Sequence, residues 1–120
     1  MNSFYNLPDA EAVVLEKLWE QEQPIKQSQF LILVQEAGKE WKRQTLNTFL
    51  SRLEEKGLVK REHRMVSAVY SKEEYSLMQM KEALNYMYDG RLSNFVAAFT
   101  KGNGINAEEA EELIKILEDY

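Results

Sequence analysis

Residues 42–70, which read KRQTLNTFLSRLEEKGLVKREHRMVSAVY, decide the fold of this 120-residue chain. The first half repeats apolar residues at helical spacing: Leu46, Phe49, Leu50 and Leu53. Gly57 then stands where a helix often ends in a left-handed residue. Two runs of strand formers, 58–62 and 66–70, follow, separated by three residues. The stretch predicts a helix over 42–56 and a β-hairpin. Because no Asn-Gly or Asp-Gly turn is present, the hairpin depends on β-propensity alone.

Two shorter helices are expected before this stretch. Pro8 and the acids after it favour the start of the first helix, which ends before the second proline. After a short extended link at 25–26, the second helix begins at Gln27, or has Ser28 as its N-cap. Its inward residues are expected to be Phe30, Leu33, Val34 and Ala37. Three helices and a hairpin in this order are typical of a winged helix-turn-helix, so the predicted fold is mainly α with such a domain at 1–71.

The face of the 42–56 helix opposite its leucines is polar in an unusual way. It carries short neutral side chains between two arginines: Gln44, Asn47, Thr48 and Ser51, with Arg43 and Arg52. An ordinary solvated face, which is the alternative, usually holds more Glu and Lys because these are better helix formers. Short donors and acceptors flanked by arginines suit the bases and phosphates of a DNA major groove. We expect Gln44 and Asn47 to bond adenine edges. The methyl group of Thr45 or Thr48 is expected to contact thymine.

The charge of the chain is unevenly distributed. The net charge of −5 taken alone argues weakly against a nucleic-acid partner. Residues 1–70, however, hold ten basic and ten acidic side chains, whereas 71–120 hold five basic and ten acidic. Within the first part, 39–64 has eight basic and four acidic residues. We expect phosphate contacts from the basic residues of the third helix and the hairpin: Lys42, Arg43, Arg52, Lys60, Arg61 and Arg64.

Residues 72–120 predict three short amphipathic helices. Asn106 and Glu109 form a capping-box-like start for the last of them. The three helices have too little core to stand alone, so we expect them to bury their apolar stripes against a second copy, as a dimerisation domain. Folding back onto the first domain is the alternative. The residues expected at the dimer interface are Leu77, Leu84, Met87, Phe95, Phe99, Leu113, Ile114 and Leu117.

The composition excludes several classes of protein. No cysteine is present, which excludes disulfides, thiolate zinc sites and thiol catalysis. The single histidine, His63, lies at the predicted hairpin tip, so neither a transition-metal site nor a catalytic triad is favoured. We expect no enzymatic activity and no cofactor. The longest apolar run, 30–34, is too short for a membrane span, and residues 1–7 do not form a signal peptide. The expected location is the cytoplasm, with no membrane partner.

The same residues resemble the penicillinase-repressor family (BlaI/MecI/CopY). The similarity runs over most of the chain, from EAVVLEKLW at 11–19 through Trp41-x3-Thr45-x2-Thr48-x3-Arg52-Leu53-x2-Lys56-Gly57 to Tyr88-Asp89-Gly90, Phe99 and Glu111-Glu112-Leu113. The resemblance implies a homodimeric bacterial repressor with an N-terminal winged helix and a C-terminal helical dimerisation module. It also implies binding to dyad operators upstream of resistance or homeostasis genes, and release when a sensor protease triggers cleavage.

This sequence departs from the family pattern at three points. The Asn-Phe bond cleaved in β-lactam-responsive members falls on Ala98-Phe99, and an Asn94-Phe95 pair lies one turn earlier. The cysteine motif of the copper-responsive branch is absent. Gln44 and Asn47 stand where the family has basic residues, which predicts a different operator sequence.

The sequence therefore predicts a dimeric transcriptional repressor that recognises a dyad operator through helix 42–56 and the wing, and controls a resistance or stress-response gene. Its expected partners are double-stranded operator DNA, a second copy, and a sensor protease that acts on the C-terminal module. One alternative is a winged-helix module that binds a protein without specific DNA binding. A regulator with a small-molecule pocket between its domains is the other alternative.

Overall fold

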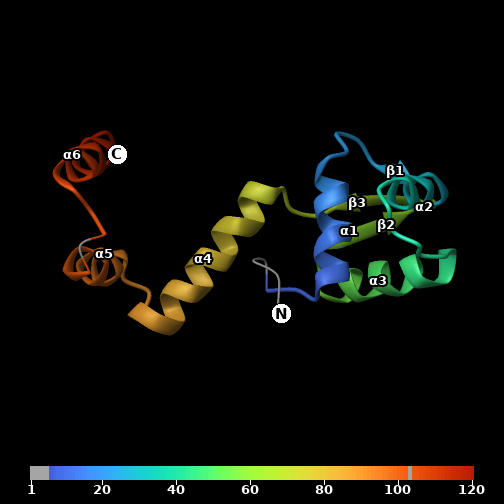
Figure 1. Cartoon of the computed structure of the whole chain (residues 1–120), viewed down its shortest axis with the longest axis horizontal. Helices are drawn as coiled ribbons and strands as arrows, with labels where there is room; N and C mark the ends of the chain where they lie inside the picture. The colour runs from blue at the N-terminus through green and yellow to red at the C-terminus, as the bar shows by residue number, and fades with distance from the viewer. Residues whose placement is uncertain (1–5, 103) are drawn as a thin grey trace. The chain divides into compact units, whose positions relative to one another are not determined.

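The computed structural model describes residues 6–102 and 104–120, which form six helices and three short strands (Figure 1). In chain order these are α1 (Asp9–Trp19), β1 (Ile25–Lys26), α2 (Gln27–Glu36), α3 (Arg43–Glu55), β2 (Val59–Glu62), β3 (Met65–Ala68), α4 (Lys72–Tyr88), α5 (Leu92–Lys101) and α6 (Ala107–Glu118). The architecture is mainly α, with three helices and a β-hairpin followed by helices alone. The predicted fold class is confirmed.

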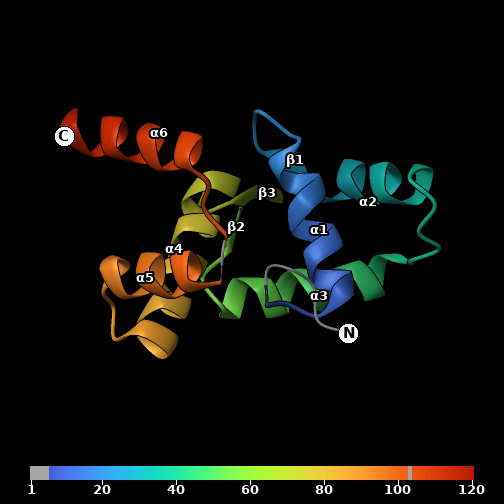
Figure 2. The same ribbon diagram turned by 60° about the vertical axis from the view of Figure 1, so that its left-hand side comes forward.

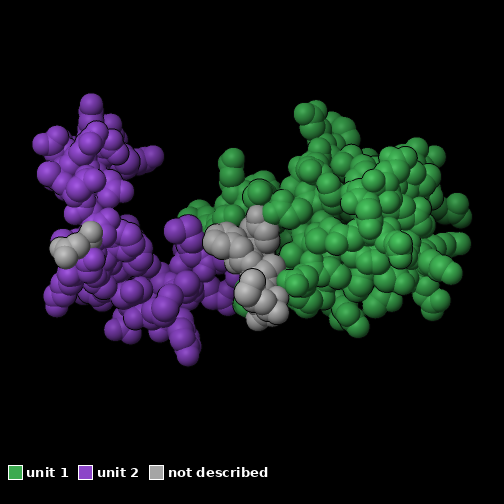
Figure 3. Space-filling model, in the orientation of Figure 1, with its two compact units in different colours: residues 1–77 green, residues 78–120 purple. Residues whose placement is uncertain are grey.

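The chain divides into two compact units, one up to Leu77 and one from Met78 to Tyr120 (Figure 3). The division falls inside α4. Its first turn belongs to the first unit because Tyr75 is buried, with its ring 5.9 Å from that of Trp19. The Trp19 Nε1–H also donates to the Tyr70 carbonyl at 2.9 Å, so the chain is held to the first unit on its way into α4.

The core of the first unit lies between α1, α2, α3 and the sheet. In Figures 1 and 2, α1 crosses α3, and the two helices are in contact along this crossing. The most deeply buried apolar side chains come from all of these elements: Val14, Leu15, Phe30, Val34, Leu46, Leu50, Leu53 and Val66. The predicted inward face of α3 is therefore correct. Phe49 is only partly buried and packs edge-on against Trp41, with ring centroids 4.9 Å apart.

In the α2 region one expectation is incomplete and one is wrong. The link at 25–26 is the strand β1, which pairs antiparallel with β3 through Ile25 and Val66 and makes a three-stranded sheet of order β1-β3-β2. Ala37 was expected to face inward but is exposed, because α2 ends at Glu36 and Ala37 is its C-cap. The helix begins at Gln27, with Lys26 rather than Ser28 as its N-cap.

The predicted hairpin is confirmed, with a tighter turn than expected. Glu62 pairs with Met65, so only His63 and Arg64 connect β2 to β3. Both have left-handed backbones, with φ of 52° and 64°. Positive φ at both central residues is the geometry of a type I′ turn, which matches the twist of the flanking strands. A type I′ turn is normally marked by Asn or Gly. His63 and Arg64 are neither, so the sequence gives no signal for this turn.

The second unit contains most of α4, together with α5 and α6. The α4 helix ends at Asp89 and Gly90, whose φ values of 54° and 73° terminate it as the Asp-Gly pair predicts. The Asn106 Oδ1 accepts the Glu109 N–H at 2.8 Å, which confirms the predicted cap of α6. Gly104 lies against the ring of Phe99, where a Cβ has no room. Among the described residues, no helix has the length and hydropathy that a membrane span requires.

Candidate nucleic-acid interface

The exposed face of α3 presents a compact set of polar groups. Since Leu46, Leu50 and Leu53 are buried, the opposite side of the same helix must face solvent. The residues exposed there are those that the sequence singled out: Arg43, Gln44, Thr45, Asn47, Thr48 and Arg52. The Thr48 hydroxyl donates to the Gln44 carbonyl at 3.1 Å, so its proton is already used within the helix. What Thr48 offers outward is its methyl group and an acceptor oxygen.

The hairpin of β2 and β3, which is the wing of the winged helix, contacts this face through Arg61. From the centre of β2, the guanidinium donates to Asn47 Oδ1 at 2.7 Å and to Ser51 Oγ at 2.9 Å. It also forms an ion pair with Glu54 at 2.9 Å, and Gln27 Oε1 lies 3.5 Å from Nη1. Arg61 was expected to hold a phosphate, like the other basic residues of the wing. The structure instead places its guanidinium among side chains of α3 and the start of α2.

The other basic residues predicted for DNA contact are unpaired. In the described part of the chain, no ion pair involves them: Lys42, Arg43, Arg52, Lys60 and Arg64. All five are exposed. Lys56, which contributed to the basic count of 39–64, differs from them because its Nζ lies 2.5 Å from Oε1 of the buried Glu11. The positive field of this region therefore comes from side chains on α3, at its start and on the wing.

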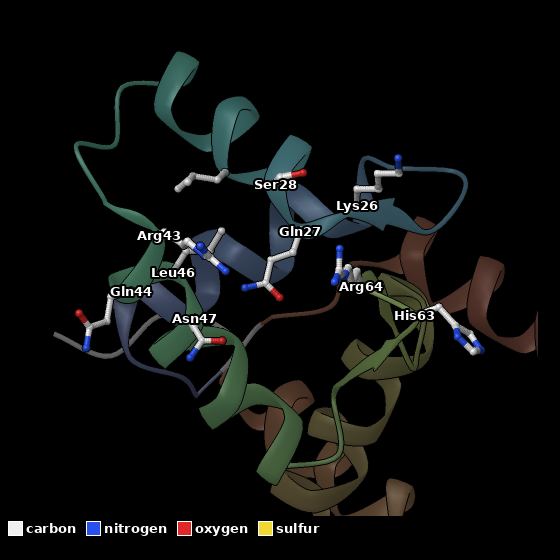
Figure 4. Close-up of a pocket in the computed structure, with 10 residues that line it drawn as sticks. Lys26, Gln27, Ser28, Arg43, Gln44, Leu46, Asn47, His63 and Arg64 are labelled. Carbon is white, nitrogen blue, oxygen red and sulfur yellow. The ribbon is translucent and has the colours of Figure 1, made fainter.

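A groove of about 1020 Å³ runs between α3, the start of α2 and the hairpin turn. Figure 4 shows Arg43, Gln44 and Asn47 reaching out from α3 on one side, with Gln27 and Arg64 across from them. The His63 imidazole, also in Figure 4, points away from Asn47. The Gln27 N–H donates to the Arg64 carbonyl at 3.0 Å, so the turn is attached directly to α2. The groove brings together residues that lie far apart in the sequence.

Sequence reasoning missed the three polar residues that line this groove at the start of α2: Lys26, Gln27 and Ser28. They stand where β1 meets α2, and the first turn of α2 has no side-chain cap. The positive dipole end of a helix start favours a phosphate, and Lys26 adds a full charge. The missing signal is β1 itself, since two residues are too few to show a strand pattern.

Most of the residues predicted for the dimer interface are exposed in the single chain. No residue of α5 or α6 is buried in the single chain. Of the eight predicted residues, six are exposed and two, Leu84 and Phe95, are partly buried: the exposed ones are Leu77, Met87, Phe99, Leu113, Ile114 and Leu117. The Phe95 ring lies 5.6 Å from that of Tyr88 and 5.7 Å from that of Phe99. The first of these contacts joins α4 to α5, and the second lies within α5.

The candidate cleavage bond lies inside α5. Ala98 and Phe99 are both exposed and both helical. A protease that acts on this bond must therefore first meet a locally opened α5. The earlier Asn94-Phe95 pair is in the first turn of the same helix, where the Asn94 side chain donates to the Tyr88 carbonyl at 3.2 Å.

A winged helix with a polar, cation-flanked third helix defines a class of DNA-binding regulators. Residues 7–119 match the model of the penicillinase repressor family, and the chain belongs to this family. The search of curated proteins found no match to this chain. The match confirms the resemblance found in the sequence. The family consists of DNA-binding transcriptional repressors rather than enzymes, and transcriptional repression is therefore the general role of the chain.

Proposed function

We propose that this repressor acts as a homodimer that binds a dyad operator and inserts α3 of each chain into the major groove. The observation that carries the proposal is the exposed face of α3. Its short hydrogen-bonding side chains lie between unpaired arginines and beside a groove formed with the wing. A helix of this kind fits a major groove about 12 Å wide.

The base contacts are assigned to the neutral residues of α3. Gln44 and Asn47 carry carboxamides, which can bond an adenine edge. Thr45 and Thr48 offer methyl groups to thymine, and the occupied hydroxyl proton of Thr48 favours this role. A good bidentate contact between a side chain and a base discriminates against a wrong base by about 1–3 kcal/mol.

The phosphate contacts are assigned to the five unpaired basic residues: Lys42, Arg43, Arg52, Lys60 and Arg64. Lys26, at the start of α2, lies on the same groove and extends this set. Each phosphate contact adds roughly −0.9 to the slope of log K against log salt. Lys60→Ala should therefore reduce the magnitude of the slope by about 1 per chain while leaving sequence preference unchanged.

The second copy is proposed from the apolar side chains of α4, α5 and α6. Large exposed apolar patches on a soluble domain mark interaction sites. A self-complementary interface between these helices would give the twofold symmetry that a dyad operator requires. We further propose that the regulated gene serves resistance or stress response, and that a sensor protease acting at Ala98-Phe99 relieves repression.

Selection of bound sites from random duplex DNA tests this function, with the mass of the protein measured in parallel by light scattering. We expect enrichment of inverted repeats whose half-sites lie about one helical turn or slightly more apart, bound by two chains. Affinity should fall steeply with salt. Failure to enrich any sequence, together with salt-insensitive binding to a protein, would contradict the proposal and favour the protein-interaction alternative.

A further inference from the structure

The guanidinium of Arg61 is surrounded by acceptors within the protein. Its Nη1 donates to Asn47 and Gln27, and its Nη2 donates to Ser51 and Glu54. The four terminal N–H groups thus have one acceptor each, and only 21% of the side chain is exposed. With Glu54 as counter-ion, Arg61 is placed to organise α3 rather than to reach a phosphate.

This arrangement dictates how the Asn47 side chain is turned. A guanidinium has donors and no acceptor, so the group of Asn47 that faces it must be the carbonyl oxygen. The carboxamide nitrogen, with two donors, is then left for other partners. A carboxamide without such a neighbour samples two opposite orientations, because its terminal torsion is broad and roughly twofold.

We propose that Arg61 is a positioning residue, which holds Asn47 with its amide donors outward and so determines the base that Asn47 recognises. The inference rests on the proposed function of α3 in the major groove. Outward donors pair with acceptors on a base edge: N7 and O6 of guanine, N7 of adenine or O4 of thymine. Cytosine offers only the N4 donor on this edge and is excluded. Adenine stays within the permitted set.

Two other roles of Arg61 make different predictions. A phosphate contact would affect all DNA sequences alike, and a merely structural tie between wing and helix would lower stability and overall affinity without changing base preference. Only a positioning role couples Arg61 to Asn47 at one base pair. The measurement must therefore be base preference, position by position, rather than affinity alone.

The test uses the full chain and a panel of duplexes derived from the selected operator, with each position changed in turn to the other three bases. Asn47→Ala should lower discrimination about 10-fold or more at one position per half-site. Arg61→Lys keeps the charge but loses the planar fork, so it should lose most of the same discrimination at the same position. The double variant should lose no more than either single variant. Arg64→Lys is the matched control: as a proposed phosphate contact of the same wing, Arg64 should affect all duplexes alike, and its replacement should leave base preference unchanged.

A second variant, Asn47→Asp, replaces the outward donor of residue 47 with an acceptor. Asn47→Asp still accepts from Arg61 but presents an oxygen outward in place of the amide nitrogen. Preference at that position should shift toward cytosine N4 or adenine N6, which are donors. A carboxylate presents an oxygen in either orientation, so this shift should persist when Arg61→Lys is added.

The outcomes separate the two proposals. If Asn47→Ala changes no base preference, the proposed reading role of α3 is wrong. If Asn47→Ala lowers discrimination while Arg61→Lys, at unchanged Tm, does not, the reading role stands and the positioning role is overturned. An equal loss of affinity for all duplexes in Arg61→Lys also overturns it.

Discussion

The two units of this chain treat their apolar side chains in opposite ways. The first unit buries Phe30, Val34 and Leu50 completely and leaves few large apolar side chains exposed among its described residues. The second unit has helices of similar length, yet α5 and α6 bury nothing, and Leu117 is 66% exposed. The first unit therefore has a closed apolar core. The second unit has amphipathic helices whose apolar side chains are mostly exposed in the single chain.

The charges divide close to the same place. The first seventy residues are neutral overall, so the cations of α3 and the wing, the proposed DNA contacts, meet no large opposing field there. The remaining residues carry the whole excess of acids, which keeps a helix surface with many apolar residues soluble. The residues proposed to contact DNA and those proposed to form the dimer thus lie in parts of the chain that differ in net charge.

The largest expected effect comes from removing a side chain of the closed core. Leu50 is fully buried, and Leu50→Ala should lower the free energy of unfolding of the first unit by about 3–4 kcal/mol through lost burial and a cavity. Urea unfolding followed by tryptophan fluorescence measures this directly, since Trp19 and Trp41 both lie in the first unit. Leu117→Ala is the matched control and should leave this transition unchanged. Equal shifts for the two variants would contradict the division into a closed and an open unit.

The next effect concerns the open unit. Ile114→Glu places a charge on the exposed face of α6 and should halve the mass measured by light scattering. Loss of the second half-site contact should weaken operator binding by about 100-fold or more. Ile32→Glu on α2 is the control, because Ile32 and Ile114 are both 54% exposed. A dimer that survives Ile114→Glu, or is lost equally with Ile32→Glu, would place the interface elsewhere.

Local spacing is enough to predict much of this molecule. Leu46, Leu50 and Leu53 mark one side of α3, and the polar candidates for DNA contact follow on the other side because a helix has only one such opposite face. The Asp89-Gly90 stop and the Asn106 cap are equally local, and both are where the sequence predicts them.

The parts that sequence reasoning missed depend on distant partners. The strand β1 exists because Ile25 meets Val66, and nothing in two residues announces that pairing. Likewise, the surroundings of Arg61 depend on how β2 lies against α3, so an arginine in a basic segment is interpreted as one more phosphate contact. One missed feature was local: Ser71 and Glu74 fit the capping-box pattern, and the structure has both of its hydrogen bonds.

The smallest effect compares helix caps in the two units. Ser71 caps α4, where the first turn is also anchored by the buried Tyr75, whereas Asn106 caps α6, which has no buried residue. Either cap is worth about 1 kcal/mol. In α4 the packing of Tyr75 limits the effect of losing the cap to the first turn. In α6, which buries no residue in the single chain, the cap supplies a large share of the helix stability when the partner copy is absent.

Asn106→Ala, made in the monomeric Ile114→Glu background, should therefore lower amide-exchange protection about fivefold throughout α6, since 1 kcal/mol corresponds to a factor of about five. Ser71→Ala in the same background should lower protection only in the first turn of α4. Restoring Ile114 should reduce the Asn106→Ala effect, because burial against a second chain then supplies what the cap did. If Asn106→Ala has the same effect in the monomeric and dimeric backgrounds, α6 does not depend on the partner for its stability, and the contrast between the two units fails at this helix.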